Sequence, residues 1–429
     1  MVDEWKDCLL GDVIELKRGY DLPRKKRLPG DVPLISSSGV TDSHALAMVK
    51  GPGVVTGRYG TLGQVFYVEQ DFWPLNTTLY VRDFKGNDPR FISYFLRGVD
   101  FSAYSDKAAV PGLNRNHLHQ AKVRLPTDLT EQRAIAHILG SLDDKIELNR
   151  RMNETLEAMA SALFKSWFVD FDPVMDNALA AGNPIPEELL DRAALRESLG
   201  DARKPLPDNL RDLFPDDFAL TEEMGWIPKG WEVDSLSNIA TLNPESWTAK
   251  TAPAQIQYVD LANTKNGRIN LIVPYQFVDA PSRARRVLRQ DDTIIGTVRP
   301  GNRSFAYIHD DDLTGSTGFA VMRPTEECFR SFVYLCLTRD EVIDHFAHLA
   351  DGGAYPAIRS EVVADFACAQ PEKELFIHFD KLVSPWIYGI GEREAAIKSL
   401  SMLRDTLLPK LLSGEIRIPE AEKLVEAAG

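Results

Sequence analysis

A chain of 429 residues, with 44% hydrophobic and 26% charged residues, is long enough for two or three globular domains at roughly 150 residues each, which excludes a fibrous or wholly disordered protein. Four cysteines without a CxxC pair are too few for a disulfide scaffold and favour a reducing, cytoplasmic compartment. The net charge of −14 excludes a histone-like coat on DNA but not a binding protein with local basic loops.

The acidic charge is concentrated in the middle of the chain. Residues 131–228 carry 10 basic and 20 acidic side chains, a balance of −10, whereas residues 1–130 carry 17 and 15, a balance of +2. The start, MVDEWKDCLL, lacks the basic and apolar stretches of a signal peptide. No run of 18 apolar residues occurs, so no membrane span is expected.

Residues 1–127 are predicted to form a β-rich unit. Short apolar or β-branched runs at 54–55, 64–68 and 78–81 are bounded by glycine and proline turns. A short helix with proline in its first turn is predicted to begin at Pro89.

A long helix is predicted over residues 128–171. Asp128 and Glu131 resemble a capping pair at its start. Apolar residues then recur every three or four positions, which is typical of a coiled-coil seam: Ile135, Ile138, Leu142, Ile146, Met152, Leu156, Met159, Leu163 and Trp167. Residues 172–228 are acidic and interrupted by prolines, so they are predicted to be a loop-rich connector with at most a short helix around 186–199.

The same order of parts recurs in the second half. Residues 229–371 repeat the first unit and residues 372–416 repeat the long helix, followed by a tail over 417–429. Ala354-Tyr-Pro-Ala-Ile matches Ala109-Val-Pro-Gly-Leu at an offset of 245 residues. The second seam would use Phe379, Leu382, Trp386, Ile390, Leu400, Leu403, Leu407 and Leu411, and five of these positions match the first seam at an offset of 244.

An internal duplication follows from these matches. Each long helix needs a partner for its apolar stripe. We therefore expect an α+β fold, with two pseudo-symmetric α+β units separated by a pair of long antiparallel coiled-coil-like helices.

No complete catalytic motif occurs in the sequence. It contains no Pro-Pro dipeptide of the kind an adenine methyltransferase uses to hold a flipped base, and no GxxxxGK[ST] phosphate loop. Gly57, Gly60 and Gly63 lack dinucleotide-type spacing and are interpreted as turn glycines. Asp12, Glu15 and Lys17 weakly resemble a nuclease motif, and an ordinary role on the surface is favoured for them. The histidine pairs His117/His119 and His345/His348 have no other zinc ligand at the required spacing, so surface or core roles are favoured for them as well.

Basic clusters and strand ends are the candidates for DNA contacts. Two clusters would contact phosphates without reading sequence: Arg24, Lys25, Lys26 and Arg27 between two prolines, and Arg283, Arg285, Arg286 and Arg289 in the second unit. Planar or amide donors on turns after apolar strands would read base edges: Arg58, Tyr59, Asn76 and Thr77, with Arg299 and Arg303 after the matching strand of the second unit. Pairing of each arginine with a nearby carboxylate is the open alternative.

Several spaced motifs resemble the specificity subunits of type I restriction-modification enzymes. They are Leu113-Asn-Arg-Asn-His-Leu through Leu125-Pro-Thr-Asp-Leu-Thr-Glu-Gln, Leu142-Asp-Asp-Lys-Ile, Leu163-Phe-Lys-Ser-Trp-Phe, Gly225-Trp-Ile-Pro-Lys-Gly-Trp and Leu407-Leu-Pro-Lys-Leu-Leu-Ser-Gly. The resemblance covers nearly the whole chain. It implies two target-recognition domains, residues 1–127 and 229–371, which each read half of a bipartite site in double-stranded DNA.

The resemblance also implies partners. Two adenine-methyltransferase (modification) subunits and restriction or motor subunits would dock on the chain in a cytoplasmic antiviral defence complex, with no membrane contact. S-adenosylmethionine, ATP and Mg²⁺ are expected on these partners and no cofactor on this chain, which would itself be non-catalytic.

The polar face of the first long helix is the expected docking surface. It carries Glu131, Gln132, Asp143 and Asp144, and like charge should keep it away from DNA phosphates. Glu131-Gln132 has no clean second copy, so two docking surfaces that differ are expected. Two alternatives remain open: a single-chain nuclease or methyltransferase, and a two-headed helical scaffold that joins proteins without DNA.

Overall fold

The computed structural model describes residues 5–59, 62–104, 112–200, 206–353 and 355–428. The chain divides into two compact units, unit 1 (residues 1–150 and 394–429) and unit 2 (residues 151–393). The long helices α4 (Leu129–Phe168) and α11 (Lys373–Ser413) each contribute one part to each unit. Gly60 and residues 109–111 of the predicted repeat lie outside the described residues.

Unit 1 is built on a four-stranded antiparallel sheet of order β2-β8-β5-β6. Its strands are β2 (Glu15–Arg18), β8 (Thr78–Asp83), β5 (Gly53–Gly57) and β6 (Val65–Val68). A second sheet has the order β4 (Gly39–His44), β3 (Val32–Ser36), β7 (Trp73–Pro74), and β1 (Trp5–Leu9) pairs with β9 (Lys122–Pro126). The helices are α1 (Leu10–Val13), η1 (Arg24–Lys26), α2 (Pro89–Arg97), η2 (Phe101–Tyr104), α3 (Arg115–Leu118) and α12 (Ile418–Ala428).

Unit 2 repeats that central sheet in the order β13-β22-β19-β20. Its strands are β13 (Ala240–Leu242), β22 (Phe319–Pro324), β19 (Thr293–Gly296) and β20 (Phe305–Tyr307). A second sheet has the order β17 (Val273–Gln276), β14 (Gln255–Val259), β21 (Leu313–Ser316), β18 (Ala284–Leu288). Three strand pairs complete the β structure: β10 (Phe218–Thr221) with β11 (Gly225–Pro228), β12 (Glu232–Ser235) with β23 (Ala367–Gln370), and β15 (Thr264–Lys265) with β16 (Arg268–Ile269).

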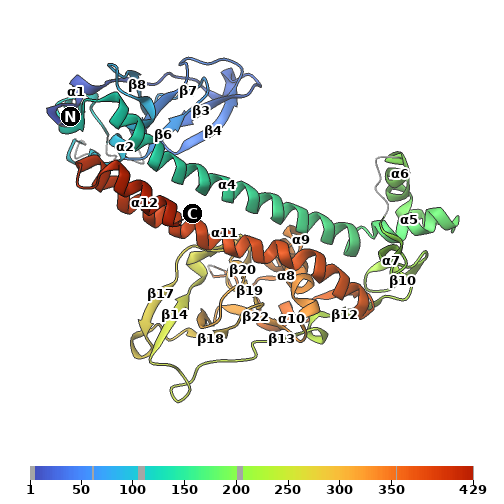
Figure 1. The fold of residues 1–429 in the computed structure, drawn as a ribbon. Coiled ribbons are helices and arrows are strands. Elements are labelled where there is room, and N and C mark those ends of the chain that lie inside the picture. Colours follow the sequence, from blue (N-terminus) through green and yellow to red (C-terminus); the bar gives the residue numbers. More distant parts are fainter. Residues whose placement is uncertain (1–4, 60–61, 105–111, 201–205, 354, 429) are drawn as a thin grey trace. The chain divides into compact units, whose positions relative to one another are not determined.

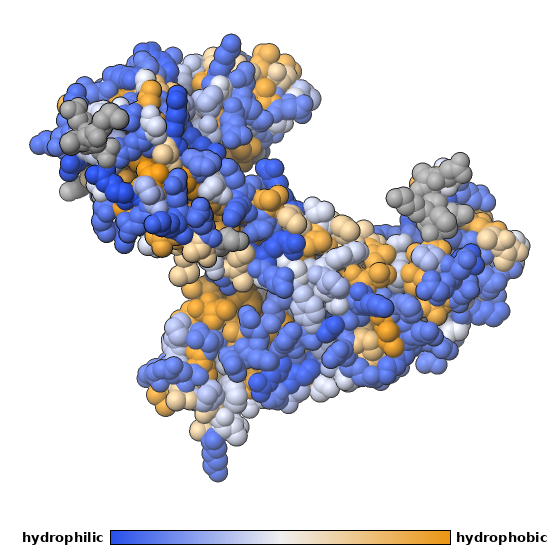
Figure 2. All heavy atoms as spheres, viewed as in Figure 1, coloured by the Kyte–Doolittle hydropathy of each residue, from blue (hydrophilic) through white to orange (hydrophobic). Residues whose placement is uncertain are grey.

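The α-helices of unit 2, besides its parts of α4 and α11, are α5 (Asp172–Ala181), α6 (Leu190–Ser198), α7 (Asp208–Arg211), α8 (Arg330–Thr338), α9 (Asp340–Leu349) and α10 (Ser360–Ala364). Short 3-10 turns include η8 (Pro300–Asn302). Within the described ranges, no helix is both long and apolar enough to cross a membrane. On the face in Figure 2, hydrophilic residues cover most of the surface and apolar ones are scattered, as is usual for a folded protein.

The two units share one hydrogen-bonded frame. In unit 1 the Leu10 N–H donates to the Ala121 carbonyl at 2.8 Å, and in unit 2 the Leu236 N–H donates to the Phe366 carbonyl at 3.1 Å. Ala121 and Phe366 are separated by the predicted offset of 245 residues. The α+β fold with two related units is therefore confirmed.

Antiparallel pairing of the long helices is found inside each unit (Figure 1). In unit 1, Asp143 of α4 contacts Arg404 of α11 at 2.7 Å, while Glu131 at the start of α4 contacts Arg417, beyond the end of α11. In unit 2, the Asn153 Nδ2 donates to the Ile390 carbonyl at 3.4 Å, and further along the rings of Phe164 and Phe379 pack together. Position numbers rise on one helix as they fall on the other, as predicted.

Three predicted seam positions are wrong. Met152 is 39% exposed, Met159 is 44% exposed and Leu382 is 42% exposed. The buried neighbours are Asn153, Ala160 and Val383, each one position further along. A straight helix repeats every 3.6 residues rather than 3.5, so the buried stripe drifts away from a strict heptad pattern over this length.

The structure corrects the expectation of a loop-rich connector over 172–228. Its described residues form the helices α5, α6 and α7, a short 3-10 helix (Glu187–Leu189) and the β10–β11 hairpin. Its apolar side chains join the same core as the end of α4; among them are Val174, Met175, Phe214 and Ile227. The expected C-terminal tail is also a helix, α12, whose Ala421 is buried in the core of unit 1.

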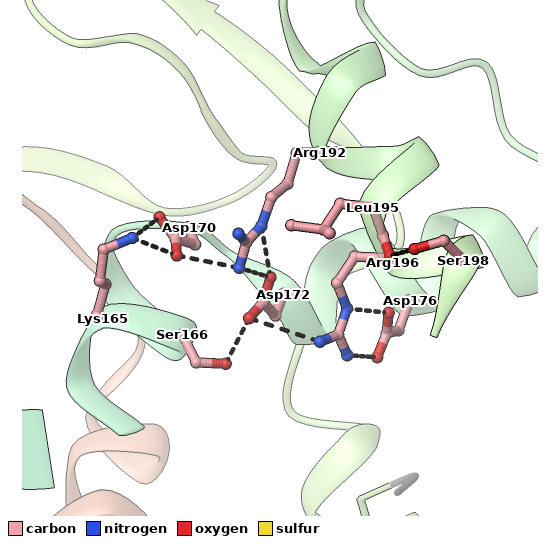
Figure 3. Close-up of polar contacts among 9 residues, drawn as sticks. All are labelled: Lys165, Ser166, Asp170, Asp172, Asp176, Arg192, Leu195, Arg196 and Ser198. Carbon is pink, nitrogen blue, oxygen red and sulfur yellow. Dashed lines mark hydrogen bonds and ion pairs between the residues drawn. The ribbon is translucent and has the colours of Figure 1, made fainter. Parts of the chain in front are cut away.

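Ion pairs fasten α5 and α6 to the end of α4 (Figure 3). Asp172 is buried, and its carboxylate accepts hydrogen bonds from the Ser166 hydroxyl at 2.8 Å and from the Arg192 Nε at 2.8 Å. The Arg196 Nε donates to Asp176 at 2.9 Å. Each arginine is 20 residues from its carboxylate. Helical periodicity relates only residues three or four apart, so it cannot reveal such pairs.

Asp172→Ala is expected to lower the free energy of unfolding of unit 2 by about 1–3 kcal/mol, because it leaves polar groups in the core without their acceptor. The control is Asp191→Ala, since Asp191 lies exposed on α6, the helix that carries Arg192, and there a change within about 0.5 kcal/mol is expected. Urea unfolding followed by circular dichroism measures both. Equal midpoints for the two variants would contradict the role of Asp172.

Candidate nucleic-acid interface

In unit 1, Arg58 and Tyr59 directly follow β5. They lie beside Thr77, the residue that precedes β8. The Arg58 N–H donates to the Thr77 carbonyl at 2.8 Å, and the Arg58 carbonyl accepts from the Leu113 N–H at 2.9 Å. The Arg58 guanidinium lies over the Tyr59 ring, 4.6 Å from its centroid. The structure thus brings three predicted base-reading residues together on backbone that is held from two sides.

Asn76 and Thr77 lie in the same group. The Asn76 amide nitrogen donates to the Asp21 carboxylate, which also contacts Arg18 at 3.7 Å. The Thr77 hydroxyl is buried and has no hydrogen-bond partner among the described residues. Sequence reasoning missed Arg18 and Asp21, because no local spacing connects them with Asn76, 55 residues away from Asp21.

The equivalent frame in unit 2 carries different side chains. The Thr297 N–H donates to the Gly318 carbonyl at 2.8 Å, and the Thr297 carbonyl accepts from the Ile358 N–H at 2.9 Å. Thr297 therefore occupies the position of Arg58. Arg299 follows the matching strand as predicted but lies two residues beyond that position.

Arg299 and Arg303 flank η8 in left-handed backbone conformations, with φ of 49° and 62°. The Arg299 side chain is exposed and lies 4.7 Å over the Tyr355 ring. The Arg303 guanidinium donates to Asn266 at 2.9 Å and to Asp340 at 2.5 Å. Arg303 is therefore paired with a nearby carboxylate, which is the alternative to base reading that the sequence left open.

The first basic cluster lies in η1 and the residue after it. Arg24, Lys25 and Lys26 are exposed, whereas Arg27 donates to Asp42 at 2.6 Å. The hydrogen bond from Arg27 holds the pKa of the Asp42 carboxyl below its ordinary value. Three of these four cations are therefore exposed, as phosphate contacts require.

The second basic cluster lies in and next to β18 and has more internal contacts. Arg283 donates to Asp260 at 2.5 Å, and Arg289 contacts Glu245 at 3.2 Å. Arg285 stacks over the ring of a phenylalanine, and Arg286 donates to a serine hydroxyl at 3.3 Å. Burial lowers the pKa of the Arg286 guanidinium. Side-chain contacts within unit 2 thus occupy donors that the predicted phosphate contacts would need.

Gln132 was predicted to dock a partner, and the structure corrects this. Its side chain is 0% exposed. Its amide nitrogen donates to Asn87 at 2.8 Å and to the Pro126 carbonyl at 2.9 Å, and its oxygen accepts from the Asp88 N–H at 3.0 Å. Gln132 therefore fastens the start of α4 to unit 1. Asp128 caps the same helix end by accepting from the Thr130 N–H at 2.9 Å.

The predicted acidic docking residues contact cations of unit 1. Asp143 accepts from the Tyr94 hydroxyl at 2.7 Å and from Arg97 at 3.0 Å, in addition to Arg404. Burial raises the pKa of the Asp143 carboxyl, but these hydrogen bonds outweigh it and hold the pKa below its usual range. Asp144 contacts Arg90 at 2.5 Å and is the most exposed of the four predicted docking residues.

The weak catalytic matches have structural contacts. Glu15 pairs with Arg82, and the His119 Nε2 accepts a hydrogen bond from the Leu16 N–H at 3.0 Å. In the described part of the chain, no group of three or more histidine, cysteine, aspartate or glutamate side chains is arranged to hold a metal ion.

The same main-chain hydrogen bonds occur in both units, with different polar groups at the strand ends, so the chain is a protein of two related units. The family model of the type I restriction modification DNA specificity domain matches residues 2–158. The chain is 26% identical to the type I restriction enzyme HindI specificity subunit of Haemophilus influenzae, over 97% of this chain and 100% of that protein. It is 23% identical to the MjaIX specificity subunit of Methanocaldococcus jannaschii, over 90% and 82%.

The crystal structure of a type I restriction-modification S subunit from M. genitalium has the same fold, with a TM-score of 0.59 over 96% of each chain at 14% identity. Residues 2–158 thus match the type I restriction modification DNA specificity domain, and the whole chain is similar to type I restriction enzyme specificity subunits.

The stability of unit 1 is expected to fall as the pH drops below about 6.5. Burial is the main cause that lowers the pKa of His119, and only the neutral ring can accept from the Leu16 N–H. The stabilisation is present above the unfolded pKa of about 6.5 and is lost as the pH falls through the lower folded pKa.

Thermal unfolding of His119→Gln and His117→Gln at several pH values checks this expectation, since His117 is exposed. His119→Gln should flatten the change in melting temperature between about pH 7 and pH 5, and His117→Gln should follow the unmodified chain. Parallel curves for all three proteins would contradict it.

Proposed function

We propose that this chain is the sequence-specific DNA-recognition subunit of a type I restriction-modification complex, in which each unit reads one half of a bipartite site in double-stranded DNA. The observation that carries the proposal is one hydrogen-bonded frame built twice, with Arg58 in one copy and Thr297 in the other. Because the backbone is the same and the side chains differ, the two copies would read two different half-sites.

Affinity and specificity would come from different residues. Arg24, Lys25 and Lys26 would neutralise phosphates, which adds affinity without reading sequence. Arg58 and Asn76 in unit 1 and Arg299 in unit 2 would read base edges, whereas the buried Thr77 hydroxyl would not reach them. The arginines at 283, 286, 289 and 303 would support these surfaces through their contacts inside unit 2.

The proposed partners are two methyltransferase (modification) subunits and restriction or motor subunits. They would carry S-adenosylmethionine, ATP and Mg²⁺, while this chain binds no cofactor and is non-catalytic, since its sequence holds no complete methyltransferase or nucleotide-binding motif. Asp144, which is 63% exposed, remains a candidate docking residue on α4. A cytoplasmic location goes with this proposal because the DNA substrate lies there.

Replacing residues 1–127 by those of another specificity subunit should change one half of the methylated motif and leave the other half unchanged, because the two frames are built from separate residues. Cells that express the chain with its methyltransferase partner are analysed by single-molecule sequencing of methylated adenines. A change in both halves would contradict independent reading. Methyl transfer by the purified chain alone would favour a single-chain enzyme, and the absence of DNA binding by the complex would favour a protein scaffold.

Lys25→Ala combined with Lys26→Ala should weaken binding to all duplex sequences alike. The slope of log affinity against log salt concentration should become shallower by about 1.8, since each phosphate contact contributes about 0.9. The matched control is Arg27→Ala, because Arg27 is already paired with Asp42. Fluorescence anisotropy of the methyltransferase-bound chain at several salt concentrations measures the slope. An unchanged slope in the double variant, or an equal change in the control, would show that this turn does not contact phosphates.

A further inference from the structure

The Tyr59 ring lies directly against a glycine. A Cβ atom added at Gly112 would lie 2.6 Å from the Tyr59 Cε1, much closer than van der Waals contact. Tyr59 and Gly112 also form a backbone bridge. Because Gly112 has no Cβ atom, the Tyr59 ring can lie against it. The Arg58 guanidinium in turn lies over this ring, 4.6 Å from the ring centroid.

Arg58 differs from the paired arginines around it. The structure gives it no carboxylate contact among the described residues, and its polar contacts are through its backbone. Five other arginines in the described part of unit 1 contact a carboxylate at 3.0 Å or less: Arg27, Arg82, Arg90, Arg97 and Arg404. The contact with the Tyr59 ring needs none of the hydrogen-bond donors of the guanidinium, so its N–H groups remain available for a ligand.

Unit 2 lacks this arrangement at the equivalent position. Val298 forms the bridge there with Ala357, where unit 1 has Tyr59 with Gly112. The smaller valine leaves room for the alanine Cβ. The Thr297 hydroxyl, in the place of the Arg58 side chain, donates to the Gly318 carbonyl at 2.8 Å. The three residues that build the arginine stack are thus replaced together.

We propose that Arg58, supported by Tyr59 and positioned through Gly112, is the guanine-reading residue of unit 1, and that unit 2 reads its half-site without an arginine at this position. The proposal rests on the proposed function. Guanine is the base that matches this donor, because its O6 and N7 atoms are two adjacent acceptors in the major groove that a planar guanidinium contacts together. Rigid stacking lowers the entropy lost when the side chain binds.

The test uses the complex of the full chain with its methyltransferase partner. The methylated motif is determined first, and exchange of residues 1–127 identifies the half read by unit 1. Each guanine in that half is then replaced by 7-deazaguanine, which lacks the N7 acceptor. At one guanine the replacement should weaken binding by the unmodified complex and have no effect on Arg58→Ala. Arg58→Ala should also lose about 5- to 150-fold of the preference for that base pair over its substitutes.

Two further pairs of variants test how the arginine is positioned. Gly112→Ala should reduce discrimination at the same base pair because it displaces the Tyr59 ring, whereas Ala357→Gly in unit 2 should leave that pair unaffected. Tyr59→Phe should keep the preference and Tyr59→Ala should lower it, since only the ring face supports the guanidinium. Arg82→Ala removes an arginine that is paired with Glu15 and should change no base preference. Melting temperatures verify that every variant is folded.

The proposal is overturned if the half-site of unit 1 contains no guanine, or if 7-deazaguanine weakens the unmodified complex and Arg58→Ala equally at every guanine. It is also overturned if Gly112→Ala leaves the base preference unchanged. Absence of any sequence preference in the unmodified complex would instead overturn the proposed function, so the two failures are distinguishable.

Discussion

The antiparallel contact between α4 and α11 is the constraint on which both units depend. Each helix carries an apolar stripe about 40 residues long that is stable only against a partner. In each unit a further helix is held against this pair by a carboxylate, which is partly exposed in unit 1 and buried in unit 2. Asp143 binds Arg97 and Tyr94 of α2 in unit 1, and Asp380 binds Arg330 and Ser331 of α8 in unit 2. α2 packs against β5 and β6, and α8 packs against β19 and β22, so each central sheet is connected to the helix pair through one of these helices.

The two units have kept the same main-chain hydrogen bonds, whereas the side chains at their strand ends differ. Main-chain hydrogen bonds that depend little on residue identity recur at an offset of 245, for example at Leu113 and Ile358. Side chains at the ends of the same strands have changed, so that one frame presents Arg58 and the other Thr297. A recognition protein benefits from this division, because loops at strand ends change without altering the core that positions them.

The net charge of −14 is a poor guide to function here, because some charged side chains pair with one another and others are exposed without a partner among the described residues. Acidic residues of the middle segment pair with arginines inside the core of unit 2, as Asp172 does with Arg192. Lys25 and Lys26 are exposed on a turn. DNA responds to local exposed charge within about a Debye length, so such a turn can bind phosphates on an acidic protein.

The sequence alone determined the fold class, the duplication, the two long helices and the resemblance to specificity subunits, because these depend on periodic burial and on spaced motifs that a chain displays along its length. The tertiary structure alone decided the role of each polar residue. Gln132 is adjacent to Glu131 in the sequence but is buried in unit 1, and Arg303 pairs with Asp340 across 37 residues. The ion pairs between α5 and α6 join residues that are 20 apart in the sequence. Such contacts depend on three-dimensional distance, which local sequence patterns do not encode.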